Sequence, residues 1–184
     1  MTTTLDIPHT STPAPRPLLA RGTAVAAAVL LLGGGTVAIL AGSEQVGDHT
    51  QGLGALSEIV TGLAFLAAAF CLVLQRPVRG WRAWLWSLAP FGLTVGGLTM
   101  LAVPVLGQEP PGWLFLLGVV PSFVGLVAAG VLGTRRLWPW WTGVAVALFL
   151  PIMFALPFNS VPMAGVWVCV ALTARARGVS AAAR

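Results

Sequence analysis

Residues 22–41 read GTAVAAAVLLLGGGTVAILA, a run of twenty residues without a charge that directly follows Arg21. At a rise of about 1.5 Å per residue, a helix of this length is long enough to cross the ~30 Å hydrocarbon core of a bilayer. The run therefore predicts a first membrane span. A cleaved signal peptide is the alternative, because residues 41–43 resemble a cleavage site, but the apolar stretch exceeds the usual ~7–15 residues and follows a long tail.

The composition of the whole chain agrees with this interpretation. Of its 184 residues, 57% are hydrophobic and 8% are charged, and the mean hydropathy is +0.90. A water-soluble globule of this composition would have little polar surface, so lipid is the expected solvent. The formal net charge of +5 comes from scattered arginines that form no run of four or more, so we expect no nucleic-acid partner.

Five further apolar segments follow, and short polar gaps separate them. We expect spans at about residues 55–75, 83–106, 113–133, 138–156 and 160–174. The last two come from one apolar stretch, 137–174, that is too long for a single crossing, and residues 157–162 provide a break that contains two prolines. Because the final segment is short, a bundle of five spans is the fallback.

The charges predict the orientation of these spans. All ten cationic residues are arginines, and they lie in every second gap, whereas four of the five carboxylates fall in or beside the remaining gaps. Short loops rich in arginine are retained on the cytoplasmic side during insertion. The sequence therefore predicts an all-α, polytopic transmembrane helical bundle of six spans in the cell membrane, with both termini cytoplasmic.

The two ends of the chain are predicted to lie outside this bundle. Residues 1–20 contain four prolines and little apolar surface, which is typical of a disordered cytoplasmic tail. Residues 21–175 form the predicted membrane domain, and residues 176–184 form a short cytoplasmic tail.

Glu58 is the one carboxylate clearly inside a predicted span, where it lies beside Ser57 and Thr61 near the outer end. A charge in hydrocarbon costs about 2.5–3.5 kcal/mol at the membrane centre and less near the surface, so it needs a partner, water or a proton. We interpret Glu58 as a candidate cation or proton site that Asp48, His49 or Glu44 completes from the preceding loop. The alternative is a carboxylate that reaches the outer headgroups.

A second candidate feature is Pro121, which is followed by Ser122 near the middle of the span at 113–133. A proline inside a helix removes one backbone hydrogen bond, and broken membrane helices often mark transport sites. This position is therefore a candidate helix break with a binding role, and a plain kink is the alternative.

Small residues recur at the spacing that lets membrane helices approach closely. We expect them to pack the helices of one chain, with a homodimer interface as the alternative; they are Gly92, Gly96, Gly118, Gly125, Ala129 and Gly133. Most of the eight tryptophans lie near predicted span ends, which predicts an interfacial belt; among them are Trp81, Trp84, Trp86, Trp113, Trp138, Trp140 and Trp141.

The sequence predicts no metal or cofactor, because no histidine lies inside a span and the charged loop at 44–49 fits no established zinc spacing. It also lacks hydrolase and phosphate-loop motifs, so an enzyme is the least favoured function. We expect a non-catalytic subunit, scaffold or modulator whose partners are the lipid bilayer and other membrane proteins or a second copy. The alternative is a small transporter or channel for a small or apolar solute that uses Glu58 and the break at Pro121.

Overall fold

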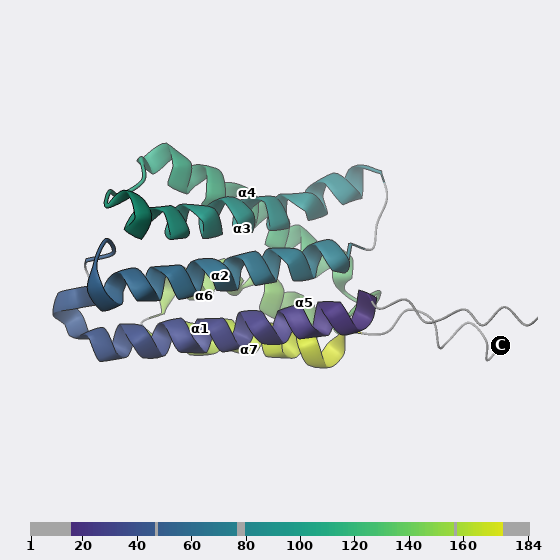
Figure 1. Ribbon diagram of the computed structural model, residues 1–184. Coiled ribbons are helices and arrows are strands. Elements are labelled where there is room, and N and C mark those ends of the chain that lie inside the picture. Colours follow the sequence, from purple (N-terminus) through teal and green to yellow (C-terminus); the bar gives the residue numbers. More distant parts are fainter. Residues whose placement is uncertain (1–15, 47, 77–79, 157, 175–184) are drawn as a thin grey trace, which may run out of the picture.

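The protein is an all-helical bundle (Figure 1). The computed structural model describes residues 16–46, 48–76, 80–156 and 158–174, and no β-strand occurs within these ranges. The seven helices are α1 (Arg16–Val46), α2 (Gly52–Leu74), α3 (Trp81–Leu106), α4 (Gly112–Gly133), α5 (Trp140–Ala147), α6 (Phe149–Ala155) and α7 (Ser160–Thr173). Residues 1–15 of the predicted N-terminal tail and the whole predicted C-terminal tail at 176–184 lie outside the described residues.

Four of the helices are long and apolar enough to cross a membrane. They are the segment Pro17–Gly42 of α1, with 26 residues, and the whole of α2, α3 and α4, with 23, 26 and 22 residues. At about 1.5 Å per residue, each is longer than the ~30 Å core of a bilayer. The prediction of a helical, membrane-type bundle is therefore confirmed, and the chain is compatible with a multi-pass membrane protein.

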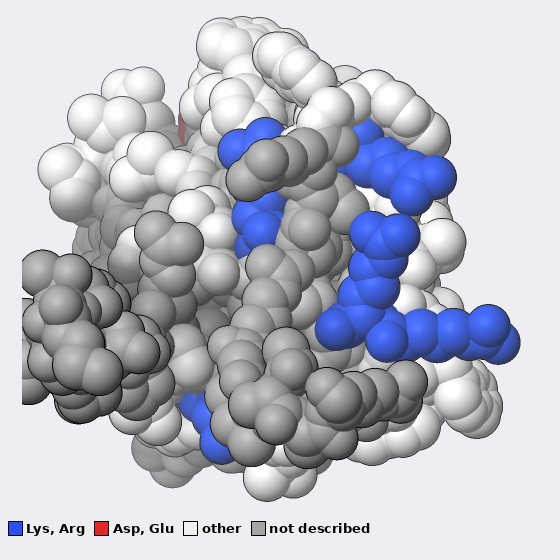
Figure 2. Space-filling view, turned by 90° about the vertical axis from the view of Figure 1, so that its right-hand side faces the viewer, with Lys and Arg blue, Asp and Glu red and all other residues white. Residues whose placement is uncertain are grey.

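The four long helices α1 to α4 run alternately in opposite directions, so the connections between them alternate between the two ends of the bundle, whereas α5 and α6 follow one another through Leu148 (Figure 1). The described chain begins and ends at the same end, where α7 lies beside α1. Exposed arginines gather at this end (Figure 2), and those within the described residues are Arg21, Arg76, Arg82, Arg135 and Arg136. The loops that carry Asp48 and Glu109 lie at the opposite end, so the two ends of the bundle carry opposite charge.

The C-terminal helix α7 is much shorter than its neighbour α1. The guanidinium group of Arg21 donates two hydrogen bonds, of 3.0 and 2.8 Å, to the carbonyl oxygen of Ala174 at the end of α7. At the start of α7, Ser160 packs against Gly35, where an added Cβ would lie 2.5 Å from the Ser160 Cβ. The 14 residues of α7 therefore cover only the stretch of α1 between Arg21 and Gly35.

Two of the predicted boundaries differ from the structure because of proline. Residues 16–20, which were predicted to belong to the tail, are helical, since Pro17 lies in the first turn of α1, where a missing N–H costs no helical bond. The segment 138–156 is divided at Leu148 into α5 and α6. Pro151 follows Ala147 by four residues, and it both lacks the N–H that Ala147 would accept and crowds that carbonyl.

The predicted break at Pro121 is absent, because α4 is a single helix from Gly112 to Gly133. Membrane helices tolerate an internal proline where neighbouring helices and local adjustment accommodate the freed carbonyl. Of these two prolines, therefore, Pro151 follows a helix interruption and Pro121 does not.

The arginine-bearing end of the bundle is closed by two stacked tryptophans. Trp86 is fully buried and its indole N–H donates a 2.9 Å hydrogen bond to the carbonyl of Leu72 in the last turn of α2. Its ring stacks on that of Trp138, which is also buried, with centroids 5.9 Å apart. The interpretation of these two residues as part of an interfacial belt is therefore wrong, whereas Trp81 and Trp84 are exposed.

Candidate functional site

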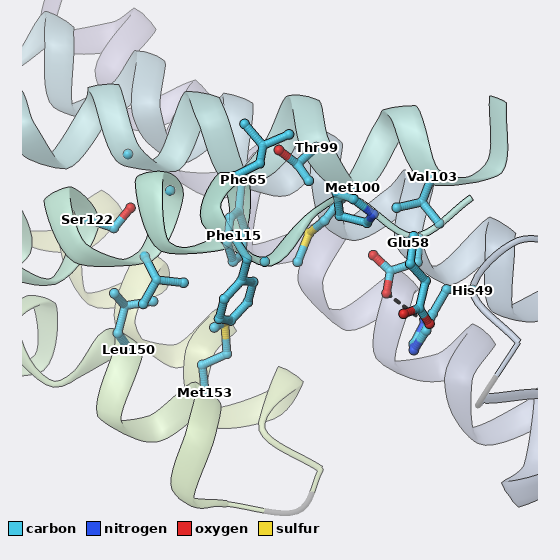
Figure 3. Close-up of a pocket in the computed structure, with 18 residues that line it drawn as sticks. His49, Glu58, Phe65, Thr99, Met100, Val103, Phe115, Ser122, Leu150 and Met153 are labelled. Atoms are coloured by element: carbon cyan, nitrogen blue, oxygen red, sulfur yellow. Dashed lines mark ion pairs between the residues drawn. The ribbon is translucent and has the colours of Figure 1, made fainter. Parts of the chain in front are cut away.

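A cavity of about 470 Å³ lies between α2, α3, α4 and α6, towards the end that carries the acidic loops (Figure 3). Most of its wall is apolar, from Phe65, Met100, Val103, Leu114, Phe115, Val119, Leu150 and Met153. Polar side chains lie mainly at the end near the acidic loops, where the lining residues are His49, Glu58 and Glu109. Its volume falls in the range of about 300–1,000 Å³ that is usual for pockets that bind small molecules.

The cavity exists because α3 and α4 meet through small residues along its inner part. An added Cβ at Gly92 would overlap the backbone and hydroxyl of Ser122, and one at Gly118 would lie 3.2 Å from the nitrogen of Gly96. These four residues line the cavity but send no large side chain into it. Larger residues at these positions would separate the helices and fill the space between them.

Further along the α3–α4 contact, the other predicted packing residues lie outside the cavity. An added Cβ at Gly125 would overlap the backbone of Ala89, and Ala129 is fully buried. Gly133 lies against the indole ring of Trp138. These residues fix the positions of α3 and α4 in the half of the bundle nearer the arginine-bearing end. They thereby support the cavity walls in the other half.

The charged end of the cavity is organised by an ion pair between a loop and a helix. The Nδ1 atom of His49, in the α1–α2 loop, lies 2.9 Å from Oε1 of Glu58 in α2. The Glu58 side chain is 21% exposed and that of His49 is 42% exposed, so the carboxylate is the less hydrated of the two groups. Figure 3 shows the pair at one end of the cavity and Ser122 at the other.

The structure brings only part of the predicted site together. Ser57 donates a 3.1 Å hydrogen bond to the carbonyl of Gly34 in α1, and Thr61 also lies against Gly34. Both residues therefore face α1, and neither lines the cavity that Glu58 lines. Ser122 lies in the cavity wall and is 3% exposed, whereas Pro121 does not line it.

Asp48 is adjacent to His49 in the chain but has a different role. Its Oδ1 accepts hydrogen bonds from the backbone N–H of Thr50, at 3.0 Å, and from the hydroxyl of Thr50, at 2.7 Å. These bonds from Thr50 lower the pKa of the exposed Asp48 carboxyl below its ordinary value. Asp48 thus stabilises the loop that carries His49 and lies outside the cavity wall.

Sequence reasoning did not include Glu109 in the site. Glu109 lies in the α3–α4 loop and contributes a second carboxylate to the cavity wall beside Glu58 and His49. The signal was present, because this loop and the loop before α2 were both predicted on the outer side of the membrane.

The charged residues at this end of the cavity are His49, Glu58 and Glu109. Among the described residues, no three His, Cys, Asp or Glu side chains lie close enough together to hold a metal ion. Comparison with known protein families, curated proteins and solved structures found no match. The cavity combines an apolar interior with an end that carries two carboxylates.

Proposed function

We propose that this protein binds a small apolar or amphipathic solute in the cavity between α2, α3, α4 and α6, and that it acts as a carrier for that solute. The cavity supports this proposal because its volume and apolar wall fit a small molecule and its outer end holds polar groups that can orient one. The role of a non-catalytic subunit, scaffold or modulator stays a prediction, since no contact among the described residues points to a partner.

The proposed carrier crosses the cell membrane six times with both termini in the cytoplasm. In this arrangement α5 and α6 together form the fifth crossing and α7 forms the sixth. The gathering of exposed arginines at the end where the described chain begins and ends supports it, because arginine-rich short loops are retained on the cytoplasmic side.

Site-directed labelling tests this topology. We expect Gln108→Cys, in the α3–α4 loop, to react with a membrane-impermeant maleimide on intact cells. Arg136→Cys, in the α4–α5 loop, should react only after permeabilisation; both residues are exposed. Both variants are made in a protein in which Cys71 and Cys169 are replaced by alanine. This cysteine-free parent protein should remain unlabelled. Labelling of Arg136→Cys on intact cells would contradict the proposed orientation.

Filling the cavity should weaken solute binding. Val119 lines the cavity from α4 and is half-buried, so Val119→Trp places an indole ring where the solute would lie. We expect the affinity for tritiated neopentylbenzene, an uncharged apolar probe, to fall by about tenfold or more, equivalent to about 1.4 kcal/mol. Binding is measured by scintillation proximity with the full-length protein in lipid nanodiscs, after subtraction of protein-free nanodiscs.

Val120→Trp is the matched control for this experiment. Val120 is the next residue of α4 and is 53% exposed, so its side chain faces away from the cavity. We expect the affinity of this variant to equal that of the wild type. Equal affinities for the wild type and Val119→Trp, or no binding by the wild type, would contradict the proposed function.

A further inference from the structure

The charged groups around the cavity are distributed unevenly. Glu58, Glu109 and His49 line the end of the cavity near the acidic loops, whereas exposed arginines lie at the opposite end of the bundle; these are Arg21, Arg76, Arg82, Arg135 and Arg136. The cavity wall therefore carries two carboxylates and, as its one basic group, an imidazole. Resting on the proposed function, we infer that the solute is an amphipathic organic cation whose positive group displaces His49 from Glu58 while its apolar body fills the cavity.

The position of Glu58 explains why a cation fits here. The carboxylate is mostly removed from water and, within a membrane, an unpaired charge at this position is costly. His49 now provides the compensating hydrogen bond, at 2.9 Å. An organic cation that takes this place keeps the carboxylate paired, so the exchange of partners does not leave a buried charge alone.

His49 is suited to being displaced. It lies in the loop between α1 and α2, outside any helix, and its side chain is 42% exposed. Movement of the imidazole into water therefore needs no change in the packing of the helices. Glu58, in contrast, lies in the second turn of α2 and stays in place.

The apolar part of the cavity distinguishes an amphipathic cation from other ligands. Phe65, Met100 and Phe115 line the cavity between its charged end and Ser122 (Figure 3). Aromatic faces attract quaternary ammonium groups as well as apolar groups. A bare metal ion would make no favourable contacts with these apolar side chains. An anionic solute would be repelled by Glu58 and Glu109, and an uncharged one would gain only apolar contacts.

Two probes of the same shape test the inference. Benzyltrimethylammonium differs from neopentylbenzene only in that a positively charged nitrogen replaces a carbon. We expect the full-length protein in nanodiscs to bind the cation about tenfold more tightly than its uncharged counterpart, because only the cation gains a contact between opposite charges with Glu58. We also expect it to catalyse uptake of the cation into proteoliposomes.

Glu58→Gln should lower the affinity for benzyltrimethylammonium about tenfold and leave that for neopentylbenzene unchanged. The unchanged affinity for neopentylbenzene shows that the variant is folded. Asp48→Asn removes a nearby negative charge outside the cavity wall and should change neither affinity. His49→Ala removes the group that competes for Glu58, so it should bind the cation more tightly than the wild type.

The outcomes separate this inference from the proposed function. If wild-type protein binds neopentylbenzene but shows no preference for the cation, or if Glu58→Gln keeps that preference, the inference is wrong. The proposed binding of an apolar solute in the cavity would then still hold. Weaker cation binding by His49→Ala would overturn the displacement of His49. If neither probe binds, the proposed function is wrong as well.

Discussion

Gly125→Ala is expected to disrupt the contact between α3 and α4. The added Cβ would lie 2.5 Å from the Cα of Ala89 and 2.5 Å from the carbonyl carbon of Leu88, whereas carbon atoms in contact are about 3.5–4.0 Å apart. Both atoms belong to the backbone, so no side chain can turn away to make room. We expect a loss of stability of about 3 kcal/mol, at the upper end of the usual cost of overpacking.

The measurement is thermal unfolding in mild detergent, followed by circular dichroism and by size-exclusion chromatography. Gly165→Ala, in α7, is the matched control because a Cβ there meets no atom within 4 Å. Alanine is the better helix former, so this variant should be as stable as the wild type or up to about 1 kcal/mol more stable. Equal unfolding temperatures for Gly125→Ala and the wild type would mean that α3 and α4 lie further apart than described.

Trp86→Ala should destabilise the protein about as much as Gly125→Ala, but by leaving a cavity and not by overpacking. The substitution leaves a cavity where a fully buried indole was, removes the 2.9 Å hydrogen bond to Leu72 and takes away the ring that stacks on Trp138. Truncation of a buried tryptophan to alanine typically costs about 3–5 kcal/mol. We expect a fall of this size in the free energy of unfolding.

Trp84→Ala provides the control, since Trp84 lies two residues away in α3 and is 77% exposed. Unfolding in mixed micelles with increasing denaturing detergent should separate the two variants, with Trp84→Ala close to the wild type. Similar losses for both would indicate that the tryptophans act through the lipid interface and not through packing of the bundle.

The contrast between these tryptophans shows what the sequence can predict about this fold. Long uncharged runs and arginine-rich gaps identify α1 to α4, because hydrocarbon requires length and excludes charge. The same signals do not tell which face of a helix meets another helix. Trp84 and Trp86 are both apolar residues near a span end, and only the contact of α3 with α2 and with Trp138 buries one of them.

Proline is similarly ambiguous in sequence. Pro121 and Pro151 each remove one helical hydrogen bond, yet α4 continues past the first and the helical segment at 140–155 is interrupted ahead of the second. The packing of neighbouring helices decides whether the strain becomes a bend or a break. The residues next to each proline in the sequence do not reveal this packing.

The candidate site was partly predictable. Glu58 stands out because a carboxylate within an apolar run is unusual, and His49 lies near enough in the chain to be named as its partner. Ser57 and Thr61 are four residues apart and share the face of α2 that meets α1. Glu109 is brought to Glu58 by the pairing of loops at one end of the bundle, and no local pattern encodes that proximity.

The short helix α7 has a consequence for the surrounding lipid. With 14 residues it is about 21 Å long, whereas α3 on the other side of the bundle has 26 residues and is about 39 Å long. In the proposed six-span arrangement, the apolar surface that faces the lipid is therefore shorter along α7 than along α3, and acyl chains beside α7 would tilt or compress to match it. Such a mismatch costs a fraction of a kcal/mol per ångström, so the proposed six-span arrangement predicts a bilayer that is locally thinner along α7 than along α3.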